Sequence, residues 1–147
     1  MPRILAIDFG FKRVGIAISD PMQIIASPYE TIPGSYDTAK AADTILALLE
    51  KLKTERKYEI SDIVIGLPLN MNGSDSERTV AVRAFAKALQ EKSSLPIHLF
   101  DERLTTVQAE RALKEGRYTR KQRTSVVDTV SAVILLQTYL SLISRSL

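Results

Sequence analysis

The chain has 147 residues, of which 45% are hydrophobic and 25% are charged, and its formal net charge is +3. This length predicts one domain over residues 1–147 with an ordinary core, and the small positive charge permits a nucleic-acid partner without requiring one. The absence of cysteine excludes disulfides, thiol catalysis and cysteine-bound zinc. The single histidine, His98, lies between apolar residues of an expected strand, so we assign it a structural role.

The first segment predicts a β-hairpin with an acid and two bases at its tip. Residues 4–7 form an apolar run typical of a strand buried on both faces, and Asp8 ends it. Gly10 is expected to permit a turn with positive φ before a second strand, and Lys12 and Arg13 lie in that turn. Asp8 is either a turn residue that bonds its own backbone or a functional acid at the rim of the sheet.

The next segments predict an edge strand, a helix and a buried parallel strand. The third strand, at 24–32, contains Pro28 and ends at Pro33-Gly34, so we expect it at the edge of the sheet. Apolar residues at helical spacing predict a helix from 38 to about 56. This helix crosses over to a strand at 63–68, which should run parallel to the first.

A second helix and a fifth strand follow. Ser74, with Glu77 three residues later, is a capping-box signature that predicts a helix to about Lys92. Residues 97–100 predict a short strand, and residues 101–103 supply two acids and an arginine directly after it. The sheet is therefore expected to have a second acidic rim.

The last segment predicts two helices separated by a basic loop. We expect a helix over about 105–115, a basic loop at 116–123 and a terminal helix from about Ser125. The apolar run at 126–143 is interrupted by polar residues, which favours a buried helix over a membrane span. No long apolar segment resembling a signal peptide stands at the N-terminus, so we expect a cytoplasmic protein that does not contact a membrane.

The order of these elements resembles the α/β ribonuclease H-like fold, with a mixed five-stranded sheet of three antiparallel and then two parallel strands and helices on both faces. Four ordered motifs resemble more closely the YqgF family, also called the RuvX or Holliday-junction-resolvase-like family. These motifs are Ala6 to Gly15, Val64 to Gly73, Asp101 to Thr106, and Asp128 with the apolar helix after it. The resemblance covers nearly the whole chain.

The resemblance implies a nuclease in which carboxylates hold one or two Mg²⁺ (or Mn²⁺) ions that assist phosphodiester hydrolysis. The matching residues, as catalytic acids and as metal ligands, are Asp8, Glu102 and Asp128. In many relatives the second acid ends the strand beside the first, but here that strand ends in Gly66-Leu67-Pro68. The acid must then come from one strand further out, and the longer side chain favours Glu102, with Asp101 in reserve.

Each acid also has a plainer interpretation. Apolar residues follow Asp128 at helical spacing, which places its carboxylate toward the sheet, where it is costly unless paired or metal-bound. Alternatively, Asp128 answers Ser125 in a capping box at the helix start. Asp101 and Glu102 could likewise form a solvated turn in which Arg103 pairs locally.

The candidate substrate-binding residues are cations around the acidic rim and one tyrosine. Cations there would offset the repulsion between phosphates and carboxylates, and the tyrosine could stack on an unpaired base. The residues are Lys12, Arg13, Arg103, Arg117, Tyr118, Arg120, Lys121 and Arg123. The helix start near Gly73-Ser74 is a further candidate phosphate contact. The alternative is that the basic run is merely solvated.

The family resemblance implies a role in 5′-end processing of pre-16S ribosomal RNA, with a structured ribosomal RNA precursor as partner and a monomer or weak homodimer as the working state. Two alternatives stay open, namely a Holliday-junction or DNA resolvase and a non-catalytic nucleic-acid-binding module. An actin-like phosphotransferase is disfavoured because such enzymes close two domains of this kind over a nucleotide.

Overall fold

The computed structural model describes residues 2–104 and 120–145, and at 120–129 and 145 it describes only the helix backbone. The elements, in chain order, are β1 (Arg3–Asp8), β2 (Arg13–Ser19), β3 (Ala26–Pro33), α1 (Thr38–Glu55), β4 (Ile60–Leu67), α2 (Glu77–Lys92), β5 (Ile97–Asp101), a short 3-10 helix (Glu102–Leu104) and α4 (Arg120–Arg145). The strands form one sheet in the order β3-β2-β1-β4-β5. The predicted fold class is confirmed, since β1, β2 and β3 pair antiparallel while β4 and β5 join in parallel.

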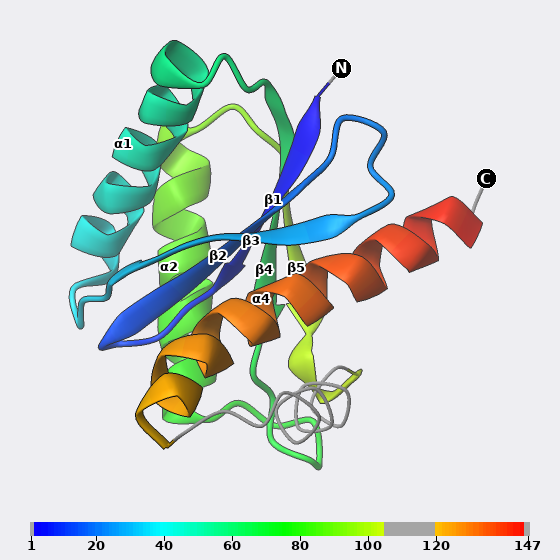
Figure 1. Ribbon diagram of the computed structural model, residues 1–147. Coiled ribbons are helices and arrows are strands. Elements are labelled where there is room, and N and C mark those ends of the chain that lie inside the picture. The colour runs from blue at the N-terminus through cyan, green and yellow to red at the C-terminus, as the bar shows by residue number, and fades with distance from the viewer. Residues whose placement is uncertain (1, 105–119, 146–147) are drawn as a thin grey trace.

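The sheet is covered on both faces, by α1 and α2 on one side and by α4 on the other (Figure 1). The central strand β1 alternates between the two layers because successive side chains point to opposite faces. Leu5 and Ile7 pack with α1 and α2, whereas Ile4 and Ala6 pack with α4, and all four are buried. The apolar run at the start of the chain is therefore a strand buried on both faces, as predicted.

One side chain of α4 forms hydrogen bonds with the first residue of the edge strand β3 and with the residue two positions before it. The Gln137 Nε2 atom donates to the Ile24 carbonyl oxygen at 2.9 Å, and the Ala26 N–H donates to Gln137 Oε1 at 3.0 Å. The side-chain amide thus takes the place of a peptide group beside the outermost strand. An unpaired strand edge invites association with other chains, and this contact satisfies part of it.

Parallel pairing brings the carboxyl ends of three strands to one edge of the sheet. Ile7 of β1 lies opposite Ile65 of β4, and Leu67 of β4 lies opposite Asp101 of β5. Asp8 is the last residue of β1, so it lies at the same edge as the end of β5. Ligands and chemistry concentrate at this edge in sheets of this kind.

The hairpin between β1 and β2 forms as predicted, but its turn is built differently. Gly10 does not adopt a positive φ, and Gly73 is the glycine that does so in the described part of the chain. Glycine is needed at position 10 for space, because a Cβ atom there would collide with the carbonyl oxygen of Arg13. The prediction of a positive φ at Gly10 was wrong.

The start of α2 also differs from the prediction. Ser76, not Ser74, caps the helix: its Oγ accepts the Thr79 N–H at 3.2 Å, and Thr79 Oγ1 accepts the Ser76 N–H at 3.0 Å. Ser74 instead donates to Asn72 Oδ1 at 2.6 Å. Thr79 is buried and also donates to the Pro68 carbonyl, which explains why the cap lies two residues later. Gly73-Ser74 is therefore not a helix start.

The terminal helix α4 begins at Arg120, five residues before the predicted start. Arg120, Lys121 and Arg123 therefore lie on the helix backbone and not in a loop. Ser125 and Asp128 lie inside the helix, so the interpretation that they form a capping box at its start was wrong. The helix predicted at 105–115, together with Arg117 and Tyr118, falls outside the described residues. In the portion that is described, no helix is both long and apolar enough to cross a membrane.

The two candidate caps give a direct test. We expect Ser76→Ala to lower the free energy of unfolding by about 0.5–2 kcal/mol, because it leaves the Thr79 N–H at the helix start without its acceptor. Ser74→Ala serves as the matched control and should stay within about 0.5 kcal/mol of the wild type. Urea denaturation measures both. A larger loss at Ser74 than at Ser76 would contradict the observed cap.

Candidate active site

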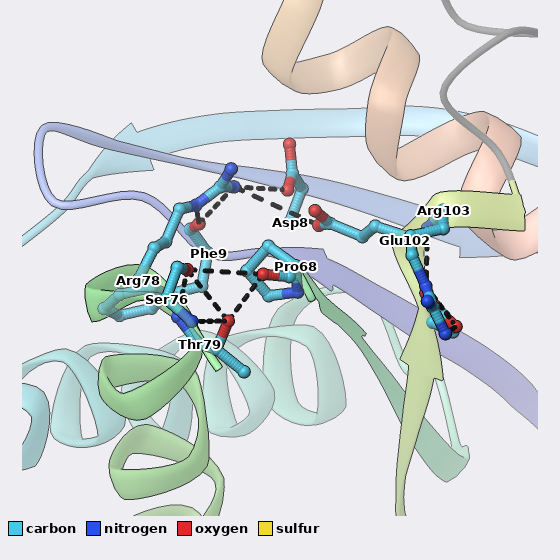
Figure 2. Close-up of polar contacts among 9 residues, drawn as sticks. Asp8, Phe9, Pro68, Ser76, Arg78, Thr79, Glu102 and Arg103 are labelled. Carbon is cyan, nitrogen blue, oxygen red and sulfur yellow. Dashed lines mark hydrogen bonds and ion pairs between the residues drawn. The ribbon is translucent and has the colours of Figure 1, made fainter. Parts of the chain in front are cut away.

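Asp8 is a buried acid at the end of the central strand, with 8% of its surface exposed. A buried carboxylate is costly unless it is paired. Arg78, from the first turn of α2, supplies that partner: its Nη2 atom donates to Asp8 Oδ1 at 3.1 Å. The same guanidinium also holds the next peptide group, since Nε and Nη2 donate to the Phe9 carbonyl oxygen at 3.2 and 2.8 Å (Figure 2).

Glu102 approaches the same guanidinium from the far side of β4. It follows β5 directly, and its Oε1 atom lies 4.0 Å from Arg78 Nη2. Its side chain extends over Gly66 of β4, where an added Cβ atom would overlap Oε1 and lie 2.9 Å from Cγ. Gly66 thus leaves the space that a longer side chain from the next strand fills. One cation therefore lies beside two carboxylates, one at the end of β1 and one directly after β5 (Figure 2).

Asp101 is engaged by a different arginine. The Arg103 Nη2 atom donates to Asp101 Oδ2 at 2.6 Å, and Nε lies within 3.0 Å of both carboxylate oxygens. This side-chain hydrogen bonding holds the pKa of Asp101 below its usual value and raises that of Arg103. Arg103 Nη1 also donates to the Met71 carbonyl oxygen at 3.2 Å. The pair therefore ties the end of β5 to the loop before α2.

The other predicted residues are placed as follows. Lys12 and Arg13 are exposed at the hairpin tip, four and five residues after Asp8. Asp128 lies on the α4 backbone, and its side chain is outside the described part of the structure, as are those of Arg120, Lys121 and Arg123. The structure thus brings Asp8 and Glu102 together, and it leaves the third acid of the predicted cage as a prediction.

Arg78 was missed by the sequence reasoning. The predicted helix began near Ser74, which gave Arg78 no particular place. One signal was available: a cation in the first turn of a helix faces the positive end of the helix dipole, which disfavours it. An arginine at that position therefore indicates a nearby negative charge. In the structure that charge is Asp8.

His98 has a structural position, as expected. Its Nε2 atom lies 2.8 Å from Asp62 Oδ2, and its ring lies against that of Tyr139 with centroids 5.6 Å apart. Val64 is its partner in the sheet, so His98 lies before the edge at which β4 and β5 end. It is not among the groups around Arg78.

The carboxylates of Asp8 and Glu102 are of the chemical type that binds a hard divalent cation. Carboxylate oxygens are the ligands that Mg²⁺ and Mn²⁺ prefer, and both acids already share one positive charge. Among the side chains that the structure describes, no group of three acids or histidines could hold a metal ion. Asp8 and Glu102 therefore fit as part of a ligand set that needs a further member.

A five-stranded sheet of this order, with a buried carboxylate at the end of its central strand, defines a protein of the ribonuclease H-like class. The fowlpox virus Holliday junction resolvase superposes with a TM-score of 0.57 at 13% identity, covering 96% of this chain and 99% of that one. RuvC of T. thermophilus, in complex with a Holliday junction substrate, gives 0.53 at 12% identity and covers 97% and 96%. These likenesses establish the fold.

The family model of RuvX, described as Holliday junction resolvase, matches residues 2–142, and the chain belongs to this family. A protein of Protochlamydia amoebophila (strain UWE25), named "Putative pre-16S rRNA nuclease", is 50% identical over 141 residues, which are 94% of this chain and 92% of that protein. The resemblance stated from the four sequence motifs is thus confirmed. The family description and the name of this relative both support the prediction that the chain is a nuclease that hydrolyses phosphodiester bonds.

The space above Gly66 gives a prediction. We expect Gly66→Ala to displace the Glu102 carboxylate, since the flexible side chain yields more readily than the strand. The melting temperature should change little, whereas Mn²⁺ affinity measured by calorimetry should fall about 10- to 100-fold, as it does when groups that orient metal ligands are altered. The control is Ser94→Ala, an exposed position between α2 and β5 at the other end of the sheet, which should leave the Mn²⁺ affinity unchanged. Unchanged Mn²⁺ affinity in Gly66→Ala would contradict the link between Gly66 and Glu102.

Proposed function

We propose that the chain is a divalent-metal-dependent nuclease that acts on a ribosomal RNA precursor, in 5′-end processing of pre-16S ribosomal RNA. The observation that carries the proposal is the convergence of Asp8 and Glu102 on one point at the carboxyl edge of the sheet. The name of the Protochlamydia relative, which shares half of its residues with this chain, supports the substrate.

In this proposal Asp8, Glu102 and Asp128 are the catalytic and metal-binding acids. Mg²⁺ or Mn²⁺ bound there would activate water and stabilise the leaving oxygen of the phosphodiester. Asp8 is positioned by strand β1 and by Arg78, which fixes both the carboxylate and the peptide group after it. Asp101 is the reserve ligand, because its carboxylate is held by Arg103, whereas Glu102 lies beside the Arg78 guanidinium that also binds Asp8.

Substrate binding in this proposal rests on cations at the same edge. Lys12 and Arg13 extend from the hairpin tip, and the guanidinium side chain of Arg78 is 42% exposed beside the acids. The remaining candidates are Arg103, Arg117, Tyr118, Arg120, Lys121 and Arg123. Positive side chains there would neutralise phosphates and release their counterions, so binding should weaken with salt.

A DNA junction is the second candidate substrate. The description of the family model as Holliday junction resolvase favours it. We prefer RNA because the Protochlamydia relative, which is 50% identical, is named for an rRNA substrate. We further propose that the chain forms one nuclease domain over residues 1–147 and works in the cytoplasm as a monomer or weak homodimer.

The acids provide the decisive test. We expect Asp8→Asn, Glu102→Gln and Asp128→Asn each to reduce cleavage of a labelled ribosomal RNA precursor by more than about 100-fold. Each removes a metal-binding charge, and altering even the groups that orient metal ligands costs about 10- to 100-fold. Binding should persist, since less negative charge faces the phosphates. Gel assays with Mg²⁺ and with EDTA measure cleavage, and the DNA junction is run in parallel.

The control for the acids is Asp43→Asn, which removes an exposed carboxylate that pairs with Lys92 on the helical layer. It should cleave like the wild type. Full activity in Asp8→Asn would remove Asp8 from the mechanism. Nucleic-acid binding without cleavage in the wild type would favour the non-catalytic module.

Arg78 should act as an internal counter-ion for the two acids. We expect Arg78→Ala to lower stability without metal by about 1–3 kcal/mol, because the Asp8 carboxylate and Phe9 carbonyl lose a charged donor. Mg²⁺ should then raise the melting temperature more in the variant than in the wild type, since the ion supplies the missing positive charge. Equal Mg²⁺-induced shifts in the two proteins would show that Arg78 and the metal do not share a site.

The matched control for Arg78 is Arg83→Ala. Arg83 lies on the same helix and pairs with Asp75, an exposed acid away from Asp8. Arg83→Ala should lower the free energy of unfolding by less than about 1 kcal/mol, because exposed ion pairs contribute little to stability. It should leave the Mg²⁺-induced shift in melting temperature unchanged.

A further inference from the structure

A ladder of aromatic rings runs from the core to the surface beside the acidic edge. The buried rings of Phe85 and Phe9 lie 4.9 Å apart, and the next step, from Phe9 to Phe11, is 5.8 Å. Phe11 then stacks on Tyr36 with centroids 4.6 Å apart and an interplanar angle of 6°. Tyr36 is 74% exposed, so the ladder ends in a ring that faces water.

The segment that carries Tyr36 is held on both sides. The Gly34 N–H donates to the Lys12 carbonyl oxygen at 2.8 Å, and a Cβ atom on Gly34 would lie 2.7 Å from the Phe11 carbonyl oxygen. After Tyr36, Asp37 caps α1 by accepting two backbone N–H groups. The short loop between β3 and α1 is therefore fixed against the hairpin tip. A surface that is already ordered loses less entropy on binding.

The stacked pair leaves one aromatic face open. Phe11 covers one side of the Tyr36 ring, so the high exposure of Tyr36 comes from its other face and its rim. Exposing an apolar ring in this way contributes nothing to the core. Lys12 and Arg13, both exposed, lie in the same hairpin tip, and Asp8 precedes Phe11 by three residues. Aromatic faces next to cations are how proteins bind single-stranded nucleic acid.

We propose that Phe11 and Tyr36 form a platform on which an unpaired nucleobase of the substrate stacks, next to the phosphodiester held at Asp8. The inference rests on the proposed nuclease function and adds to it a preference for substrates with an unpaired nucleotide beside the cleaved bond. When a base stacks on this platform, its phosphate backbone runs alongside, where the exposed cations Lys12 and Arg13 can bind it. Asp37, the acid that follows Tyr36 in the sequence, has its carboxylate engaged in hydrogen bonds from backbone N–H groups at the start of α1.

The test measures binding without cleavage. A short single-stranded RNA carrying a fluorescent adenine analogue is titrated with the protein in EDTA, and both anisotropy and quenching of the analogue are recorded. We expect Tyr36→Ala and Tyr36→Leu to weaken binding about 5- to 30-fold and to remove the quenching. Tyr36→Phe and Tyr36→Trp should retain both. Duplex RNA, whose bases are already stacked, should bind all variants alike.

Met22→Ala is the control, because it removes an exposed apolar side chain from the loop between β2 and β3. A matching single-stranded DNA should show the same dependence on Tyr36, because stacking involves the base and not the sugar. The platform is overturned if Tyr36→Ala binds and quenches like the wild type, or if Tyr36→Leu does. It is also overturned if duplex RNA shows the same loss.

The same proteins are assayed for cleavage with Mg²⁺, so that the two proposals can fail separately. Wild-type cleavage with binding independent of Tyr36 overturns the platform and leaves the nuclease proposal standing. Binding that depends on Tyr36, without cleavage in any protein, supports the platform and counts against the nuclease proposal.

Discussion

The site depends on the need to neutralise a carboxylate at the buried end of the central strand. Asp8 follows four apolar residues and has little contact with water, so its charge requires a partner inside the protein. Arg78 provides one and also fixes the adjacent Phe9 carbonyl, which joins α2 to the end of β1. This ion pair connects α2 and β1 at the carboxyl edge of the sheet. The cap formed by Ser76 and the buried Thr79 sets the start of α2 and hence the turn from which Arg78 reaches the acid.

The same edge shows how a side chain that follows one strand can reach across the neighbouring strand. The strand beside β1 ends without an acid, yet Gly66 leaves a hollow in its surface that the Glu102 side chain fills. A glutamate has one more methylene than an aspartate and can cross the width of a strand. The Glu102 carboxylate therefore reaches the guanidinium beside Asp8 although Glu102 follows the strand beyond β4. The space at Gly66 and the length of the Glu102 side chain together determine where this carboxylate lies.

Much of this could be predicted from the sequence, because strand and helix periods are local properties. The apolar run of β1, the spacing in α1 and the prolines of β3 gave the sheet and its order. The helix starts were harder, because several residues near Ser76 can cap a helix, and the choice depends on the distant Pro68 carbonyl. Arg78 and the hollow at Gly66 could not be predicted, since both depend on contacts between segments far apart in the chain.

The amide of Gln137 has a consequence for how this chain can vary. Its bonds to Ile24 and to Ala26, the first residue of β3, fix the rotation of α4 about its own axis. Asp128 lies nine residues earlier on the same helix, and each inserted or deleted residue between them would rotate it by about 100° relative to the sheet. Substitutions along this stretch can be absorbed by repacking, but a change in its length cannot. The segment from 128 to 137 should therefore keep its length wherever the position of that acid matters.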